Sequence, residues 1–146
     1  MSKRAGGPLH QSTHVLVVED DLPIAQMMAS ILADEGYEVD LAFNGRLALE
    51  MIQVQKYDLI LTDLRMPELD GVGLYRELEL RHPDLLRRLI VITGTSGHPE
   101  YENFLEKTHV PFLEKPFSLT ALQALTRQVL SASQPTLQVP SKLELM

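Results

Sequence analysis

Short apolar runs alternate with stretches of helical periodicity along most of the chain. Five runs have the composition of strands, at 14–18, 37–43, 59–61, 89–92 and 110–113. The first is continuous and rich in β-branched residues, as expected for a parallel strand that is buried on both faces. The second alternates apolar and polar positions, so it predicts a strand that is buried on one side only.

Apolar residues recur at helical spacing after each predicted strand. The first helix is marked by Ile24, Met27, Met28, Ile31 and Leu32. The next sets are Leu47, Ala48, Met51 and Ile52; Leu74, Tyr75 and Leu78; Tyr101, Phe104 and Leu105; and Leu119, Leu122, Leu125 and Val129. Asp20 or Asp21 can cap the first helix, and Gly36 can end it. The fourth set is short and weakly apolar, so we expect that helix to pack less firmly than the others.

This alternation predicts an α/β fold, a (βα)5 doubly wound parallel five-stranded sheet with helices on both faces. We expect one domain at residues 13–131. Residues 1–12 lack apolar periodicity and are predicted to be a flexible leader or linker, and residues 132–146 a flexible tail.

Composition excludes several classes of function. The 146 residues are 45% hydrophobic and 23% charged, which is ordinary for a soluble protein. Cysteine is absent, which excludes disulfides, thiolate metal sites and a cysteine nucleophile. A net charge of -7 with scattered basic residues argues against direct binding of nucleic acid. No apolar run approaches the roughly 18 residues of a membrane span, and no signal peptide is evident, so we expect a cytoplasmic chain without a membrane partner.

Residues whose side chains could take part in chemistry lie where the predicted strands end. They are Glu19, Asp20, Asp63, Thr93 and Lys115. The carboxyl ends of parallel strands lie at one edge of the sheet, so we expect these side chains to converge. Each alone has an ordinary explanation, as a helix cap, a turn residue, a β-branched strand residue or a solvated charge. Their coincidence at one edge favours a functional site.

Together these residues have the chemistry of phosphoryl transfer. Converging carboxylates repel one another unless a cation lies among them, and oxygen ligands without His or Cys favour Mg2+. The lysine adds a second positive charge, and catalysis of phosphoryl transfer is mostly positioning and charge neutralisation. Asp63 is the candidate nucleophile, since a carboxylate can form an aspartyl-phosphate.

Four segments resemble a known family. They are Val-Val-Glu-Asp-Asp at 17–21, Leu-Thr-Asp-Leu-Arg-Met-Pro-Glu-Leu-Asp-Gly at 61–71, Ile-Thr-Gly at 92–94 and Glu-Lys-Pro-Phe at 114–117. In this order and spacing they resemble the receiver domain of two-component response regulators, over about residues 13–130. The resemblance implies a flavodoxin-like fold of strand order 2-1-3-4-5. It also implies a phosphoacceptor that works in phosphorelay signal transduction.

The resemblance assigns a phosphoacceptor and a metal site. Asp63 would take a phosphoryl group from the phosphohistidine of a histidine kinase or phosphotransfer domain. Asp63, Asp20, Glu19 (through water) and the backbone carbonyl of Arg65 would bind Mg2+. Asp21 then falls outside the metal site, as a helix cap.

The resemblance also assigns the switch. Lys115 would pair with the phosphoryl group, Thr93 would move toward it, and Phe112 would respond to that movement. The face formed by the fourth helix, fifth strand and fifth helix would then bind a partner or a second copy. Arg65 and Thr95 occupy positions that in this family tune phosphoryl lifetime. Arg65 could cover the phosphoryl group or point to solvent.

Other functions remain to be compared with this one. A magnesium-dependent phosphohydrolase with an aspartyl-phosphate intermediate usually carries a second acid two residues after the nucleophile, where this chain has Arg65. A degenerate receiver that serves only as an interaction module would not need the complete site. A flavin-binding domain would need a phosphate-cradling loop after the first strand, where this chain has acids.

We therefore expect a signalling domain rather than an enzyme, one that catalyses only its own phosphorylation and dephosphorylation. No room for an output domain is evident after Leu130, so a stand-alone protein or a fragment of a hybrid histidine kinase is expected. The segments at 75–78 and 110–117 resemble the C-terminal receivers of hybrid kinases, which favours the second of these.

Overall fold

A parallel sheet forms the centre of the molecule, as the alternation predicts. The computed structural model describes residues 12–94 and 98–132. The strands are β1 (His14–Val18), β2 (Glu38–Ala42), β3 (Leu59–Asp63), β4 (Leu89–Thr93) and β5 (Phe112–Glu114). The helices are α1 (Leu22–Asp34), α2 (Gly45–Val54), α3 (Gly71–Arg81), the 3-10 helix η2 (Pro83–Arg88), α4 (Pro99–Thr108) and α5 (Leu119–Ala132).

The strand order is β2-β1-β3-β4-β5 and every pairing is parallel, which confirms the predicted fold class. The register places the strand ends nearly level. Val18 pairs with Thr62, and Asp63 pairs with Ile92. The residues that follow β1 and end β3 therefore emerge at one edge of the sheet.

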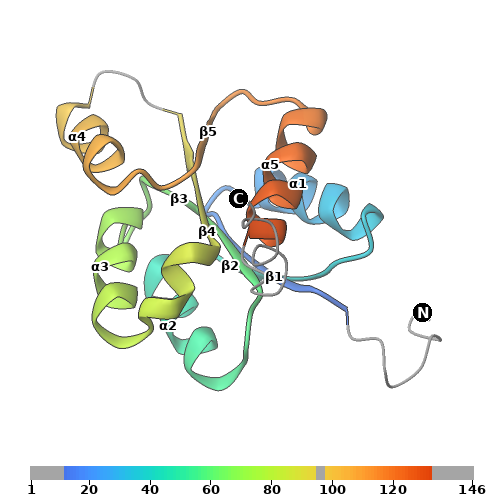
Figure 1. Cartoon of the computed structure of the whole chain (residues 1–146), viewed down its shortest axis with the longest axis horizontal. Coiled ribbons are helices and arrows are strands. Elements are labelled where there is room, and N and C mark those ends of the chain that lie inside the picture. The colour runs from blue at the N-terminus through green and yellow to red at the C-terminus, as the bar shows by residue number, and fades with distance from the viewer. Residues whose placement is uncertain (1–11, 95–97, 133–146) are drawn as a thin grey trace, which may run out of the picture.

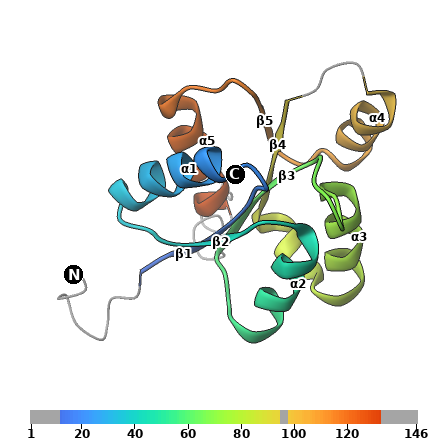
Figure 2. The same cartoon turned by 180° about the vertical axis from the view of Figure 1, so that it is seen from behind.

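Helices cover both faces of the sheet in two layers (Figures 1 and 2). On one face α1 and α5 pack against the sheet through a core built on Val15, Val17, Met28, Leu32, Leu59, Leu61, Ile90, Ile92, Leu122 and Val129. On the other face lie α2, α3 and α4, around Leu16, Val18, Ala48, Ile52, Ile60, Leu74, Leu78, Val91 and Tyr101. Successive side chains of each central strand are buried in opposite cores. For this reason β1, β3 and β4 are almost wholly apolar.

Polar side chains set where the helices begin. Asp21, Asn44 and Asp70 each accept a hydrogen bond from the backbone N–H three residues on, at 3.2, 2.8 and 2.8 Å, and so cap α1, α2 and α3. Ser118 does the same before α5, at 3.0 Å. Gly36 has a φ of +97° and stops α1, as predicted. The choice left open between Asp20 and Asp21 as the cap of α1 is thus settled for Asp21.

Two residues predicted on apolar helix faces lie elsewhere. The side chains of Met27 and Leu119 are 45% and 52% exposed. The buried stripe of α1 consists instead of Ala25, Met28 and Leu32. Periodicity locates the middle of an apolar stripe, but a residue at its margin is buried only if a neighbouring element reaches it.

Strand and helix limits also differ from the prediction in places. β2 begins at Glu38, and β5 begins at Phe112 rather than at Val110, which is buried but precedes the ladder. Pro111 has no N–H to donate, so it interrupts that part of the ladder. The 3-10 helix η2 was not predicted. The expected looser packing of the fourth helix is consistent with α4, in which Tyr101 is the buried residue.

The end segments predicted to be flexible, 1–12 and 132–146, lie almost entirely outside the described residues, and the proposed domain limits stay a prediction. Among the helices that are described, none is long and apolar enough to cross a membrane.

Thr126 in the middle of α5 offers a test of core packing. Its side chain is fully buried and, among the described residues, its hydroxyl has no hydrogen-bond partner. Such a group costs about 1–3 kcal/mol. Thr126→Val should therefore raise the free energy of unfolding in urea by about 1 kcal/mol. Thr120→Val, at an exposed position of the same helix, should change it by less than about 0.5 kcal/mol. A destabilised Thr126→Val protein would contradict this account.

Candidate functional site

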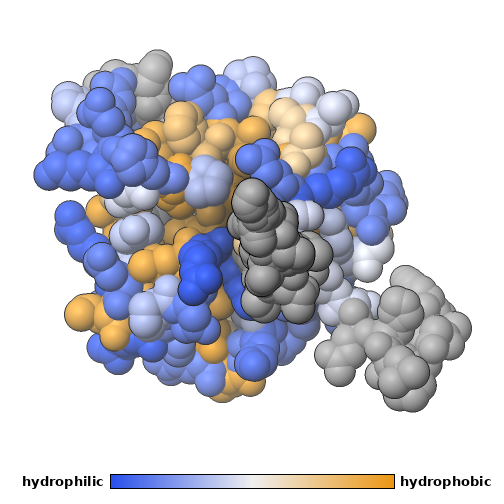
Figure 3. Space-filling model, in the orientation of Figure 1, coloured by the Kyte–Doolittle hydropathy of each residue, from blue (hydrophilic) through white to orange (hydrophobic). Residues whose placement is uncertain are grey.

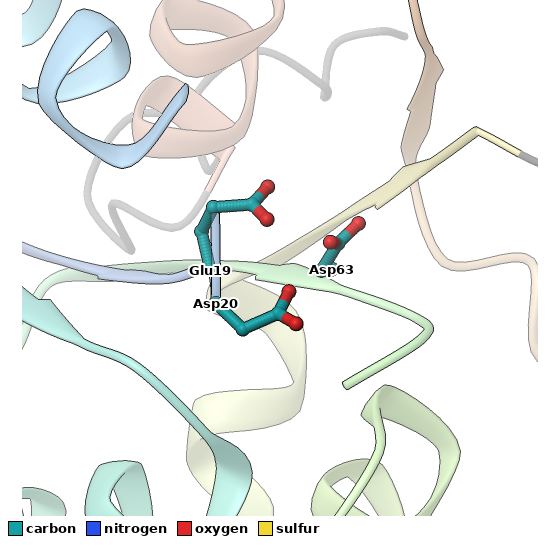
Figure 4. Close-up of side chains that lie close together, drawn as sticks. All are labelled: Glu19, Asp20 and Asp63. Atoms are coloured by element: carbon teal, nitrogen blue, oxygen red, sulfur yellow. The ribbon is translucent and has the colours of Figure 1, made fainter. Parts of the chain in front are cut away.

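The ends of β1 and β3 bring three carboxylates together. Glu19 directly follows β1, where its backbone N–H donates to the carbonyl of Ala42 at 3.0 Å, and Asp63 is the last residue of β3. Glu19, Asp20 and Asp63 each place a carboxylate oxygen within 4.8 Å of the other two. Figure 4 shows Glu19 and Asp20 extending from the end of β1 toward Asp63. Glu19 is 1% exposed and Asp63 is 7% exposed, whereas Asp20 is open to solvent.

Lys115, just after β5, neutralises part of this charge. Its Nζ lies 3.0 Å from Oε1 of Glu19 and 3.3 Å from Oδ2 of Asp63. Its backbone N–H donates to the carbonyl of Thr93 at 2.8 Å, which holds the lysine against the end of β4. A Cβ on Gly94 would come within 3.3 Å of Cδ of Lys115, so the glycine leaves a clear path for the lysine side chain.

The loop after β3 stays close to the sheet because of another glycine. The N–H of Gly71 donates to the carbonyl of Leu64 at 2.8 Å, and a Cβ on Gly71 would lie 2.5 Å from the backbone oxygen of Asp63. Any side chain here would push α3 away from Asp63. A depression of about 330 Å³ opens beside the acids, lined by Asp20, Arg65, Met66, Pro67, Asp70 and Tyr101.

Burial and charge perturb both members of the central ion pair. Burial raises the pKa of Asp63 to about 7, and the charge of Glu19 and a hydrogen bond with it act in the same direction, while Lys115 opposes them. Burial alone would lower the pKa of Lys115, but its hydrogen bond to Glu19 and the charge of Asp63 outweigh this and raise it. When ionised, three carboxylates and one ammonium leave a formal charge of -2, so the cluster suits an added divalent cation.

A family model for the response regulator receiver domain matches residues 15–127, which run from β1 into α5. The chain belongs to this family. The match includes all four site segments quoted from the sequence.

Relatives of this receiver domain are found among longer regulators. It is 32% identical over 122 residues to the transcriptional regulatory protein ZraR of Escherichia coli, an alignment that covers 84% of this chain and 27% of ZraR. It is 34% identical over 124 residues to the response regulator MprA of Mycobacterium bovis, covering 85% of this chain and 53% of MprA. The chain thus spans about half or less of the length of these relatives.

A solved structure with the same fold is the signal receiver domain of a signal transduction histidine kinase from Syntrophus aciditrophicus. The TM-score is 0.77 and the identity 31%, over 88% of this chain and 97% of that one. The agreement covers most of both chains, and so supports both the fold and the family.

The receiver domain brings together most residues that the sequence singled out. Glu19, Asp20, Asp63 and Lys115 form one cluster. Thr93 is 5% exposed and ends β4, joined to Lys115 through its backbone.

Two other predicted residues are exposed at the surface. Phe112 begins β5 and is 43% exposed. Arg65 is exposed, with its side chain directed to His98. The family roles assigned to these side chains stay predictions, and Thr95 lies outside the described residues.

Three neighbours of the site were not recognised as such in the sequence. His98, Tyr101 and Asp70 connect the loop after β3 with α4. His98 lies 33 residues from Arg65, and no local pattern links them. Tyr101 was interpreted only as a helix core residue, and Asp70 only as part of the segment at 61–71.

The raised pKa of Asp63 predicts a pH effect on the metal-free domain. Its folded-state value of about 7 lies above the 3.8 of an unperturbed aspartate, so between these values the native state binds a proton that the unfolded chain has lost. That stabilising contribution is lost as the pH rises through about 7. Asp63→Asn should remove it, and at pH 8 without metal should be more stable than wild type by on the order of 1–3 kcal/mol.

Urea denaturation in a chelating buffer at pH 5 and pH 8 measures this effect. Asp84→Asn, at an exposed position of η2, removes the same charge at the start of β4, the end of the sheet opposite to Asp63, and should keep the wild-type pH dependence. An identical pH dependence for Asp63→Asn and wild type would contradict the assigned pKa.

Proposed function

We propose that this receiver domain accepts a phosphoryl group on Asp63 from the phosphohistidine of a histidine kinase or phosphotransfer domain in a two-component phosphorelay. The supporting observation is the position of Asp63, an almost buried carboxylate at a strand end, 3.3 Å from the Lys115 ammonium and within 4.8 Å of two further carboxylates. Membership of the receiver family supports the same role.

The donor set fits Mg2+. Asp20 and Asp63 would ligate the ion directly, Glu19 through water, and the backbone carbonyl of Arg65 would complete the protein ligands. All of these are oxygen donors, and one of the carboxylates is solvent-accessible, which suits an ion that retains several waters. When bound, the ion offsets the negative charge of the acids and of the phosphoryl oxygens.

Phosphoryl transfer then follows from the positions of the side chains. A carboxylate oxygen of Asp63 attacks phosphorus in line, the P–N bond to the donor imidazole breaks, and the imidazole nitrogen keeps the electron pair. Lys115 holds its charge at neutral pH because the pKa of its amine is raised, so it can exchange its contact with Asp63 for one with a phosphoryl oxygen. Hydrolysis of the aspartyl-phosphate resets the domain.

The switch is proposed to run through Thr93 and Phe112. The new charge of about -1.5 to -2 on Asp63 attracts the hydroxyl of Thr93, which lies at the end of the neighbouring strand. Phe112, 43% exposed at the edge strand, then repacks, and the α4-β5-α5 face changes.

This face has the properties of a docking surface. In Figure 3 hydrophobic surface gathers around β5, between α4 and α5. Leu119 adds a side chain that is 52% exposed. A second copy of the domain or an output partner would bury this surface.

The competing functions fit less well. A phosphohydrolase of the expected kind would need an acid two residues after Asp63, whereas Arg65 is cationic and binds His98. A degenerate receiver would be expected to lack part of the acid and lysine set.

Related receiver domains occur in two kinds of protein. ZraR is named as a transcriptional regulator, and the Syntrophus aciditrophicus domain comes from a histidine kinase. Either context is compatible with this domain, and a cytoplasmic location stays a prediction.

The phosphoacceptor assignment predicts the outcome of labelling with acetyl phosphate and Mg2+. Wild-type protein should gain one acid-labile phosphoryl group by intact mass, and Asp63→Asn should gain none, because the amide is not a nucleophile toward phosphorus. Asp84→Asn, an exposed aspartate in η2, should label like wild type. Persistent labelling of Asp63→Asn would place the acceptor elsewhere.

The metal assignment separates two adjacent aspartates. Asp20→Asn should weaken Mg2+ binding at least roughly tenfold, measured by titration of the thermal unfolding midpoint. Asp21→Asn removes the same charge, but Asp21 caps α1 and asparagine caps equally well. Its affinity should therefore stay within about twofold of wild type. Equal losses for the two variants would mean that the effect is general electrostatics rather than ligation.

A further inference from the structure

A groove of about 680 Å³ runs between α3 and α4, which lie side by side on one face of the sheet (Figures 1 and 2). Both helices contribute aromatic rings to its lining. The rings of Tyr75 and Phe104 meet edge to face with their centroids 5.1 Å apart. Both rings are only half-buried, so part of their apolar surface is open to solvent in the groove. An apolar floor between two helices suits the packing of a further helix.

The exposed charges of this groove are balanced in sign. Arg76 and Glu79 lie on the α3 wall, and Glu100 and Lys107 lie on the α4 wall. Within residues 12–94 and 98–132, none of these four side chains forms an ion pair. The chain as a whole has a net charge of -7, which disfavours contact between two copies in general. Two positive and two negative charges remove that obstacle at the groove.

Four residues of α4 form one stripe along the groove. They are Glu100, Asn103, Phe104 and Lys107, at the spacing i, i+3, i+4 and i+7 that keeps side chains on one side of a helix. The acid and the base stand at opposite ends of the stripe, two turns or about 10 Å apart along the axis. The ring of Phe104 lies between them. The stripe is therefore complementary in charge to a second α4 that runs in the opposite direction.

We infer that two copies of this domain associate through the α3–α4 groove, with their α4 helices antiparallel across a two-fold axis. The axis passes between Asn103 and Phe104, the midpoint of the stripe. Glu100 of each copy then meets Lys107 of the other, because a two-fold contact pairs each residue with its counterpart reciprocally. The two Phe104 rings meet near the axis and cover the apolar floor of both grooves.

This interface differs from the α4-β5-α5 surface described above, because it leaves out β5 and α5. It requires neither a metal ion nor a phosphoryl group. The contact is also small, since the stripe spans two turns of a ten-residue helix. Small interfaces are typical of weak, transient association, so we expect a dimer that forms at high protein concentration and dissociates on dilution.

Reciprocal charge substitutions test the pairing. Sedimentation equilibrium of the whole chain, without Mg2+ or a phosphoryl donor, should show a concentration-dependent dimer. Glu100→Lys and Lys107→Glu should each raise the dissociation constant roughly tenfold or more, because each turns two attractive pairs into two repulsive ones. An equimolar mixture of these two variants should form a heterodimer with about wild-type affinity, since both pairs are then attractive again.

A single cysteine gives an independent test of the axis, because the chain contains no cysteine. Asn103 is exposed and stands beside the proposed axis, so Asn103→Cys should form a disulfide-linked dimer on air oxidation. Glu106→Cys is the matched control, since Glu106 is exposed on α4 but does not line the groove. It should cross-link at least roughly tenfold more slowly, because its thiols are kept apart.

Leu119→Ser, at an exposed position of α5, should leave the association unchanged. Loss of the dimer in Leu119→Ser, with retention in Glu100→Lys, would place the second copy on the α4-β5-α5 face and overturn the inference. A wild-type chain that stays monomeric in the millimolar range would also overturn it, as would a mixture of the two charge variants that does not associate. Recovery in the mixture, with faster cross-linking at position 103 than at 106, would support it. None of these results depends on phosphorylation of Asp63, which the labelling experiment tests separately.

Discussion

Two carboxylates that are almost out of contact with water share one ammonium group, and much of the architecture serves this contact. Glu19 and Asp63 are held at the ends of adjacent buried strands, where burial alone would favour their neutral forms. Lys115 offsets only part of their charge. The site is therefore electrostatically incomplete by itself, which agrees with the proposed binding of a divalent cation and then of a phosphoryl group. Burying these carboxylates lowers the stability of the folded domain, and the two apolar cores compensate for that loss.

The parallel sheet makes this arrangement possible because its register fixes where each chain segment leaves the core. Val18 pairs with Thr62 and Asp63 with Ile92, so the acids and Thr93 emerge at one level. Central strands that are apolar on both faces allow little sliding, since a shift of one residue would exchange the two cores. Gly71 then lets α3 begin against the backbone of Asp63. The strand register and the absence of a side chain at Gly71 thus keep the Asp63 carboxylate close to Glu19 and Lys115.

The helices around the site are anchored unequally, and this has consequences for signalling. α1, α2 and α3 each bury three residues, whereas α4 buries only Tyr101. A helix held by few apolar contacts can be repositioned by the energy of one or two polar contacts. The proposed change of the α4-β5-α5 face can therefore move α4 without disturbing either core.

The sequence by itself determined the alternation of strands and helices, the convergence of Glu19, Asp20, Asp63 and Lys115, and the family, because periodicity and strand-end position are local properties. It did not determine which side chains at the margin of a helix are buried, where Pro111 interrupts the last strand, or that Lys115 lies closer to Glu19 than to Asp63. Nor could it show what Arg65 binds, since His98 is distant in the chain and meets it only after α4 is placed. Tertiary structure decided these points because each depends on which separate elements come into contact.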